Sequence, residues 1–134
     1  MSTDASPTPG GRGEGTDTPY IDGFVVAVPK DRIGDYERVA QDAGALWIEH
    51  GALSFVECVA DDVSYGELTS FPRAVNATDD ETVFFSWITY KSREARDEVN
   101  KKVMADPRME GDMSDMPFDV KRMIFGGFRT LVEL

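Results

Sequence analysis

The stretch TVFFSWITYKSREARDEVNKKVMA, Thr82–Ala105, decides the fold of this chain because it joins a strand directly to a helix. Its first nine residues are rich in β-branched and aromatic side chains, with apolar residues at odd and even positions. That pattern predicts a strand buried on both faces. Ser92 is typical of a helix N-cap, and the four-residue spacing of Ala95, Val99 and Val103 predicts the helix that follows.

An equivalent strand–helix–strand unit lies in the N-terminal half of the chain. Residues 20–28 (YIDGFVVAV) are also apolar at both parities, which predicts a second strand buried on both faces. The apolar residues of 31–49 recur every three or four positions, which is the period of an amphipathic helix. Gly51 is typical of the position just after a helix, and residues 52–60 predict the next strand.

A long connection separates these two units. Residues 61–80 contain scattered polar side chains interrupted by Gly66 and Pro72, and a loop of this length is usually functional or mobile. From Glu57 to Glu81 there are seven acidic residues and one basic residue. More than half of the formal net charge of −11 is therefore concentrated in this region.

Residues 121–133 predict a last strand, whose Gly126–Gly127 pair indicates a bulge, a bend or a close backbone contact. The order is then β-α-β, long loop, β-α-β, which is the ferredoxin-like split βαβ arrangement, an α+β fold. Its four-stranded antiparallel sheet carries two helices on one face. We expect one such domain over residues 19–134, preceded by a disordered tail at 1–18 that is rich in Gly, Pro, Ser and Thr.

The second face of this sheet determines the expected assembly. Three of the four predicted strands are apolar on both faces, so helices on one side would leave a large apolar surface in water. Monomers rarely tolerate such a surface. Two sheets packed face to face would bury it, and the sequence therefore predicts a homodimer that closes a dimeric α+β barrel.

Composition excludes several classes of function. The chain has 14 Lys and Arg against 25 Asp and Glu, a balance that argues against general nucleic-acid binding. It has no apolar run of the length that crosses a membrane and no signal-peptide pattern at its start, so we expect no membrane partner. A single Cys fits a reducing compartment, and we expect a cytoplasmic location.

Three segments of the sequence are similar to those of the YbaA-like bacterial family of unknown function. They are ECVADDV (57–63), FSWITYKSR (85–93) and KRMIFGGF (121–128). The resemblance covers residues 20–134. It implies membership of the dimeric α+β barrel superfamily, which agrees with the pattern of strands and helices. That superfamily includes cofactor-free monooxygenases, isomerases, lactonases, haem enzymes and ligand-binding regulators, so the resemblance implies a fold and not an activity.

Strand parity suggests which residues could line a ligand pocket. The small side chains of Gly23, Val25 and Ala27 share one face of their strand, where they would let the helices approach closely, so Phe24 is expected to face the barrel. We predict a pocket in the barrel lined by three aromatic residues, with a charged group at its mouth. Its expected residues are Phe24, Trp87 and Phe125, with Arg122 or Glu57 at the mouth.

Candidate catalytic residues are few. Glu57 lies in the middle of a strand, where burial could raise its pKa and make it a base, although a packing role is as well supported. His50 is the one histidine and a possible base or metal ligand, but its place at a helix C-terminus favours a structural role. Packing is favoured for Cys58, and a solvated loop for Asp61–Asp62.

No phosphate-binding glycine loop, Walker motif or G-x-S-x-G motif is present, so we expect no nucleotide cofactor and no hydrolase triad. A single Cys excludes a multi-cysteine metal site, and no EF-hand spacing follows Asp61–Asp62, so we expect no metal. The leading interpretation is a dimeric barrel protein that binds a small, partly apolar molecule. Two alternatives stay open. One is a cofactor-independent monooxygenase or isomerase that uses the same pocket, and the other is an interaction module whose barrel is filled by side chains.

Overall fold

The computed structural model describes residues 18–109 and 115–134, so the predicted tail at 1–18 lies, apart from Thr18, outside the described residues. The main elements, in chain order, are β1 (Tyr20–Pro29), α1 (Ile33–Glu49), β2 (Ser54–Val59), α2 (Phe71–Ala74), β3 (Glu81–Tyr90), α3 (Arg93–Ala105) and β4 (Ile124–Arg129). Short 3-10 turns precede α1 and β4, the second of them being η4 (Val120–Arg122). The last strand is therefore shorter than the predicted 121–133.

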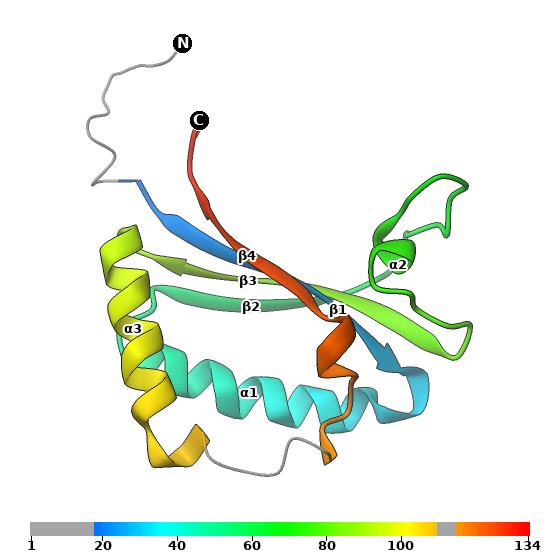
Figure 1. The fold of residues 1–134 in the computed structure, drawn as a ribbon, viewed down its shortest axis with the longest axis horizontal. Helices are drawn as coiled ribbons and strands as arrows, with labels where there is room; N and C mark the ends of the chain where they lie inside the picture. The colour runs from blue at the N-terminus through cyan, green and yellow to red at the C-terminus, as the bar shows by residue number, and fades with distance from the viewer. Residues whose placement is uncertain (1–17, 110–114) are drawn as a thin grey trace.

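The four strands form one antiparallel sheet in the order β2-β3-β1-β4. Both long helices, α1 and α3, lie against the same face of this sheet (Figure 1). This arrangement confirms the predicted ferredoxin-like α+β fold. The edges of the sheet are β2 and β4, so residues on these two strands lie far from each other across the sheet.

The main core lies between the sheet and the two helices. Val26 and Val28 of β1 are almost completely buried and pack with Phe84 of β3 against Tyr36 of α1. A second cluster continues this layer under α3, where Tyr90 and other β3 and helix side chains meet. Even-numbered residues of β1 and β3 therefore face the helices.

The prediction that Gly23, Val25 and Ala27 of β1 face the two long helices was wrong. Val25 and Ala27 lie on the opposite face of the sheet, which α1 and α3 do not cover. There they form a cluster with Val83 and with Val75, which is 1% exposed and follows α2 directly. The larger even-numbered residues of β1 fill the layer beneath α1 and α3 instead.

Residues 61–80 are more regular than a loop prediction implies. The hydroxyl of Ser70 accepts a hydrogen bond from the backbone N–H of Arg73 and caps α2. The Arg73 guanidinium stacks over the Tyr65 ring at 4.0 Å and donates to the carbonyl oxygens of Tyr65 and Gly66. The segment thereby covers one end of the sheet face that α1 and α3 leave bare (Figure 1).

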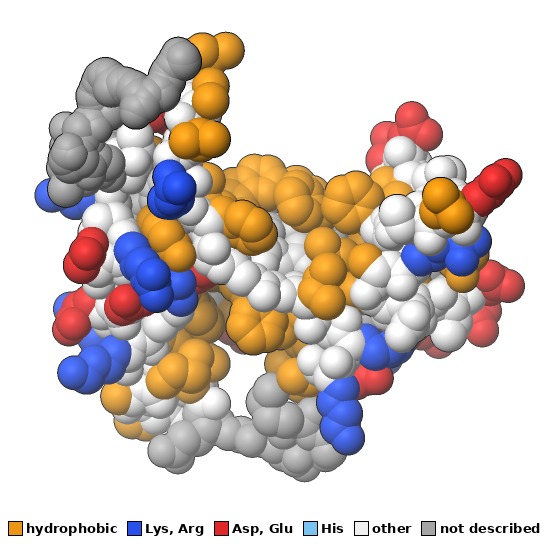
Figure 2. Space-filling model, turned by 45° about the horizontal axis from the view of Figure 1, so that its top comes forward, with side chains coloured by type: hydrophobic (Ala, Val, Ile, Leu, Met, Phe, Trp, Pro, Cys, Tyr) orange, Lys and Arg blue, Asp and Glu red, His pale blue; other side chains and the backbone are white. Residues whose placement is uncertain are grey.

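The rest of that bare face, which we call the open face, is apolar and accessible. It consists of the side chains that point away from α1 and α3 on the four strands, chiefly Ile21, Val56, Cys58, Phe85, Trp87, Ile124 and Phe128. Phe85, Ile124 and Phe128 are 45%, 44% and 63% exposed. Figure 2 shows hydrophobic side chains running across this side of the molecule.

The predicted irregularity at the glycine pair of β4 is a close contact and not a bulge. Gly126 and Gly127 pair in unbroken register with Gly23 and Asp22 of β1. A Cβ atom on Gly127 would lie 2.5 Å from the Arg96 guanidinium and 2.5 Å from the Tyr20 hydroxyl oxygen. Glycine is needed there because these two side chains cross directly over the backbone.

Helix α1 approaches β2 closely at Gly44, and this contact yields a prediction. A Cβ on Gly44 would lie 2.7 Å from the Phe55 ring, so Gly44→Ala should lower the free energy of unfolding by about 1 kcal/mol, because overpacking outweighs the better helix propensity of Ala. Gly34→Ala is the matched control in the same helix, since a Cβ there meets nothing within 4 Å, and it should be neutral or slightly stabilising. Urea unfolding measures both, and equal stability of the two variants would contradict the close approach.

Candidate functional site

A cleft of about 530 Å³ lies between α1 and the edge strand β2. One wall is a face of α1, whose lining residues recur every three or four positions from Ile33 to Ile48. Small side chains at the centre of this face leave space between α1 and β2. The other wall is formed by the alternate residues Phe55, Glu57 and Val59 of β2, with Phe84 behind them. The cleft is therefore mostly apolar and opens at the edge of the sheet.

Glu57 and Tyr36 form the polar centre of this cleft. The Tyr36 hydroxyl donates a hydrogen bond of 2.9 Å to Oε1 of Glu57. Tyr36 is 6% exposed, and its ring packs against Phe84 and Phe118 with centroid distances of 4.5 and 5.6 Å. The ring is thus fixed in the core, and the hydroxyl at its end holds the carboxyl group at the floor of the cleft.

The burial of this pair changes how its groups ionise. Desolvation raises the pKa of the Glu57 carboxyl above its ordinary value, and hydrogen bonds with Tyr36 and Ser86 offset only part of that rise. Desolvation also raises the pKa of the Tyr36 hydroxyl, and the nearby Glu57 carboxylate adds to it. Glu57 is therefore a carboxyl group that can bind or release a proton closer to neutral pH than an exposed one, as a general base would.

The polar side chains that line the cleft carry no positive charge. They are those of Glu37, Gln41 and Glu57, in addition to the Tyr36 hydroxyl. The remaining lining residues are apolar or glycine. Such an arrangement can accept hydrogen bonds and attract positive charge, and it disfavours anions.

The structure does not bring together the residues of the predicted barrel pocket. Phe24 and Phe125 stack on each other at 6.1 Å, on the face that carries α1 and α3. Trp87 lies on the open face, where it packs against Phe85 at 5.6 Å. The prediction that these aromatic residues line one pocket was wrong, because β1 presents the opposite face to the helices from the one expected.

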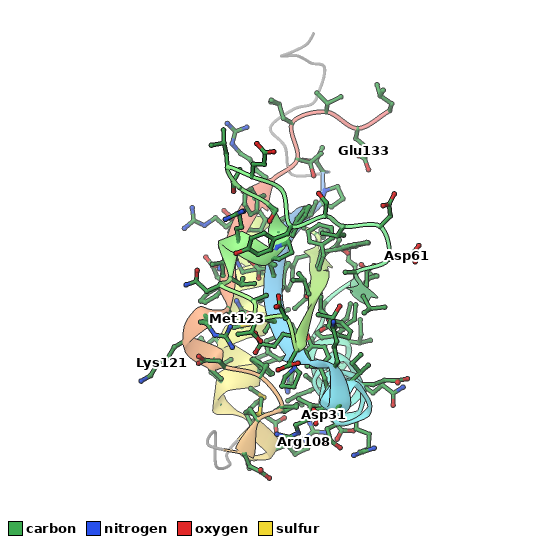
Figure 3. All side chains as sticks on the ribbon, turned by 90° about the vertical axis from the view of Figure 1, so that its right-hand side faces the viewer. Asp31, Asp61, Arg108, Lys121, Met123 and Glu133 are labelled. Atoms are coloured by element: carbon green, nitrogen blue, oxygen red, sulfur yellow. The ribbon has the colours of Figure 1, made fainter. Side chains whose placement is uncertain are left out.

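Arg122 is fully engaged far from Glu57. Its guanidinium donates to both carboxylate oxygens of Glu81, at 2.9 and 2.7 Å, to Asp119 and to the carbonyl of Asn76. These bonds hold the pKa of Glu81 down at about 2. Figure 3 shows Lys121 of η4 and Asp61, which follows β2, on opposite sides of the molecule. Arg122 thus ties η4 to the start of β3 and does not reach the cleft.

His50 also has a structural position. It follows the last turn of α1, its backbone N–H donates to Leu46, and its Nε2 lies 2.9 Å from Asp106 Oδ2. Glu49, His50 and Asp106 could together offer ligand atoms to a cation. However, Arg108 already binds the Asp106 and Glu49 carboxylates at 2.7 Å each, so the chain itself compensates part of their charge and occupies oxygens that a cation would need.

Cys58 lies on the open face and is exposed. It borders a small apolar hollow of about 190 Å³ beside α2, together with Phe71 and Phe85. The three aromatic rings of Phe71, Phe85 and Trp87 follow each other along this side, at 5.9 and 5.6 Å. The hollow carries no ionisable group near the thiol other than Asp61, which gives it no chemistry of its own.

Sequence reasoning found Glu57 but missed Tyr36, its partner. Tyr36 falls on the apolar stripe of α1, where a tyrosine is expected to be core, and only the fold brings its hydroxyl to a residue 21 positions away. The alternation of β2 places Glu57 on the same face as Phe55 and Val59, which is the signal that could have pointed to a shared cleft.

Comparisons with known proteins identify relatives without an established activity. The model of a family described as a protein of unknown function (DUF1428) matches residues 19–120. The chain is 52% identical over 114 residues to proteins called uncharacterized protein YbaA from Escherichia coli K12 and Shigella flexneri, covering 85% of this chain and 97% of theirs.

The fold also resembles a solved structure. A crystal structure of a dimeric ferredoxin-like protein from an uncultured marine organism matches with a TM-score of 0.52 at 11% identity, covering 87% of this chain and 97% of that one. At this identity the likeness concerns the fold alone. Among the described parts of the chain, no helix is both long enough and apolar enough to span a membrane.

The raised pKa of Glu57 predicts how its stability contribution depends on pH. A carboxyl group whose pKa is higher in the folded state stabilises the fold while protonated and loses that contribution as the pH rises through the folded-state pKa. Glu57→Gln should therefore be more stable than wild type at neutral pH, by about 1 kcal/mol, and this advantage should shrink in mildly acidic solution. Urea unfolding over this pH range measures it.

The matched control for losing one carboxylate is Glu37→Gln, which changes an exposed residue on the rim of the same cleft. A stability difference between Glu57→Gln and wild type that grows as the pH falls would contradict the burial argument.

Proposed function

The chain belongs to the DUF1428 family of proteins of unknown function, and from this premise we propose that it is a homodimer that binds a small, partly apolar molecule in the cleft between α1 and β2. The two halves of this proposal rest on opposite sides of the sheet. The open face supports the dimer, and the Tyr36–Glu57 cleft supports ligand binding. We expect the dimer in the cytoplasm.

The open face has the composition of a surface that another chain covers. Its exposed Phe85, Ile124 and Phe128 are contiguous with half-buried Trp87, and exposed apolar patches of this kind are rare on monomers. The chain end beyond β4 adds further exposed apolar residues, Leu131, Val132 and Leu134. Figure 3 shows Glu133 of this segment above the sheet, on the side opposite Asp31 and Arg108.

A second copy of the chain is the partner that best fits this surface. Two identical open faces are mostly apolar, and an isologous contact would cover both at once. The solved relative in fold is also a dimeric ferredoxin-like protein, according to its description. Large side chains such as Phe85, Trp87 and Phe128 from two copies would fill much of the space between the sheets, in line with the filled-barrel alternative.

The dimer can be tested with one charge on the open face. Wild type should have twice the chain mass of 14.8 kDa in light scattering, and Phe128→Glu should shift it to the monomer mass, because a carboxylate there would be buried without a partner. Met104→Glu on α3 is the matched control, since Met104 is 62% exposed but does not lie on the open face, and it should remain dimeric. A monomeric wild type would contradict the proposal.

Ligand binding in the cleft is supported by its volume and lining. Small-molecule sites are usually concave, of about 300–1,000 Å³, and mostly apolar with a few placed polar groups. The cleft of about 530 Å³ with its single hydrogen-bonded Tyr36–Glu57 pair has these properties. Because it lies on the helix side at the edge of the sheet, a dimer formed through the open face would leave it accessible.

Enzymatic use of the same cleft is a second candidate function, and one observation favours it. Glu57 has a raised pKa beside a cavity, which is a recurrent property of general bases. A cofactor-independent isomerase or monooxygenase would use this carboxylate to remove a proton from a bound carbon acid. Deuterium exchange into a bound compound, lost in Glu57→Gln, would distinguish catalysis from binding alone.

Filling the cleft should prevent binding. Phenylnaphthylamine, an uncharged apolar fluorophore, should bind wild type with increased emission, and Ala45→Trp should reduce its affinity at least about tenfold, because the indole would occupy the cleft. Ala105→Trp, at the exposed end of α3, is the control and should bind as wild type does. Equal binding by both variants would place the probe elsewhere and contradict the cleft.

A further inference from the structure

Glu57 differs from the other carboxylates that are partly or fully buried in the described residues. Asp22, Asp35, Glu81 and Asp106 each have an Arg or His side chain within 4.0 Å. Glu57 has no such ion pair, and its recorded partners are the uncharged hydroxyls of Tyr36 and Ser86. It is thus a carboxylate taken partly out of water without a cation to compensate it.

We propose that a ligand supplies this missing charge, and that the cleft selects an organic cation: an amine with an apolar body whose ammonium group binds Glu57. This inference rests on the proposed function, since it requires that the cleft binds a small molecule. It goes further by assigning the charge and the chemical class of that molecule.

The hydrogen-bonding capacity of the pair fits an ammonium group. An ionised carboxylate accepts at about four lone-pair positions, and the hydroxyls of Tyr36 and Ser86 use two of them. The Tyr36 hydroxyl donates its proton to Glu57, so its oxygen is left as an acceptor. An ammonium group has three donors and no acceptor, so it complements a site that presents acceptors.

Charge and shape exclude the other simple classes. An anionic ligand would meet Glu57 and Glu37 with no cationic side chain in the cleft lining to offset them. A strongly hydrated ion such as a metal would lose its water against Ile48, Phe55 and Phe84 without enough oxygen ligands to replace it. An apolar body suits those walls, and a single positive head group suits the floor.

The energetic argument follows from desolvation. A charge-assisted hydrogen bond is roughly twice as strong as a neutral one, and it gains further where water is partly excluded. The same partial burial that makes ionised Glu57 unfavourable in the free protein makes its pairing with a cation favourable. Occupied by an amine, the site would have the paired arrangement that the other half-buried carboxylates already have.

Three ligands with one ring system test the inference: naphthylmethylamine, naphthylmethanol and naphthoate, which are cationic, neutral and anionic near neutral pH. Calorimetric titration of wild type should give the amine an affinity at least about tenfold above that of the alcohol, with naphthoate the weakest. In mildly acidic solution the preference for the amine should disappear, because protonated Glu57 no longer carries the charge.

Glu57→Gln should lose the preference for the amine and keep the affinity for the alcohol, whereas Asp42→Asn, at an exposed carboxylate of α1 outside the cleft lining, should keep that preference. Equal affinity of wild type for amine and alcohol, or a preference for naphthoate, would overturn the cation inference and leave the ligand-binding cleft intact. Binding of none of the three would overturn both. The ranking in wild type tests the inference independently of how the variants fold.

Discussion

The sheet has two apolar faces, and its two long helices can cover only one of them. On the covered face Val26, Val28 and Phe84 are buried against Tyr36 of α1. On the other face the described residues contribute only the single turn of α2, and Val75, which follows α2, packs over Val25 and Ala27 at one end. The apolar surface that remains exposed follows from this limited helical cover, and it is the physical basis of the homodimer that we propose.

The same constraint explains what the sequence could and could not predict. The long helices were predictable because their period of about 3.6 residues is intact in the sequence, and the strands because they are rich in β-branched and aromatic residues. The sequence could not predict which side of each strand faces the helices. A strand such as β1, which is apolar at both parities, lacks the contrast that distinguishes a covered face from an open one. Helix α2, which lies on the face opposite α1 and α3, has only four residues, too few for a helical period to be recognised in the sequence.

The candidate site was predictable to the extent that one residue carries it. A carboxylate among the apolar residues of β2 is unusual in sequence alone, and Glu57 was accordingly a candidate. The pairing of Glu57 with Tyr36, and the small side chains of α1 that leave the cleft open, could not be predicted. Both depend on how α1 packs against β2 in the folded chain. Arg122 pairs with carboxylates, but the sequence could not show that Glu81 is one of them, since Glu81 lies 41 residues away in the chain.

The position of Glu57 separates the demands of folding from those of the proposed function. A neutral side chain of similar shape would avoid the desolvation of a carboxylate there, and nothing in the fold requires the charge, since no Arg, Lys or His among the described residues pairs with it. Arg122–Glu81 shows the alternative, a carboxylate whose charge the fold itself uses. Local departures from the packing rules are expected where a residue serves a site. Because this departure lies at the edge of the sheet away from the open face, assembly and binding can act on one chain without competing for the same surface.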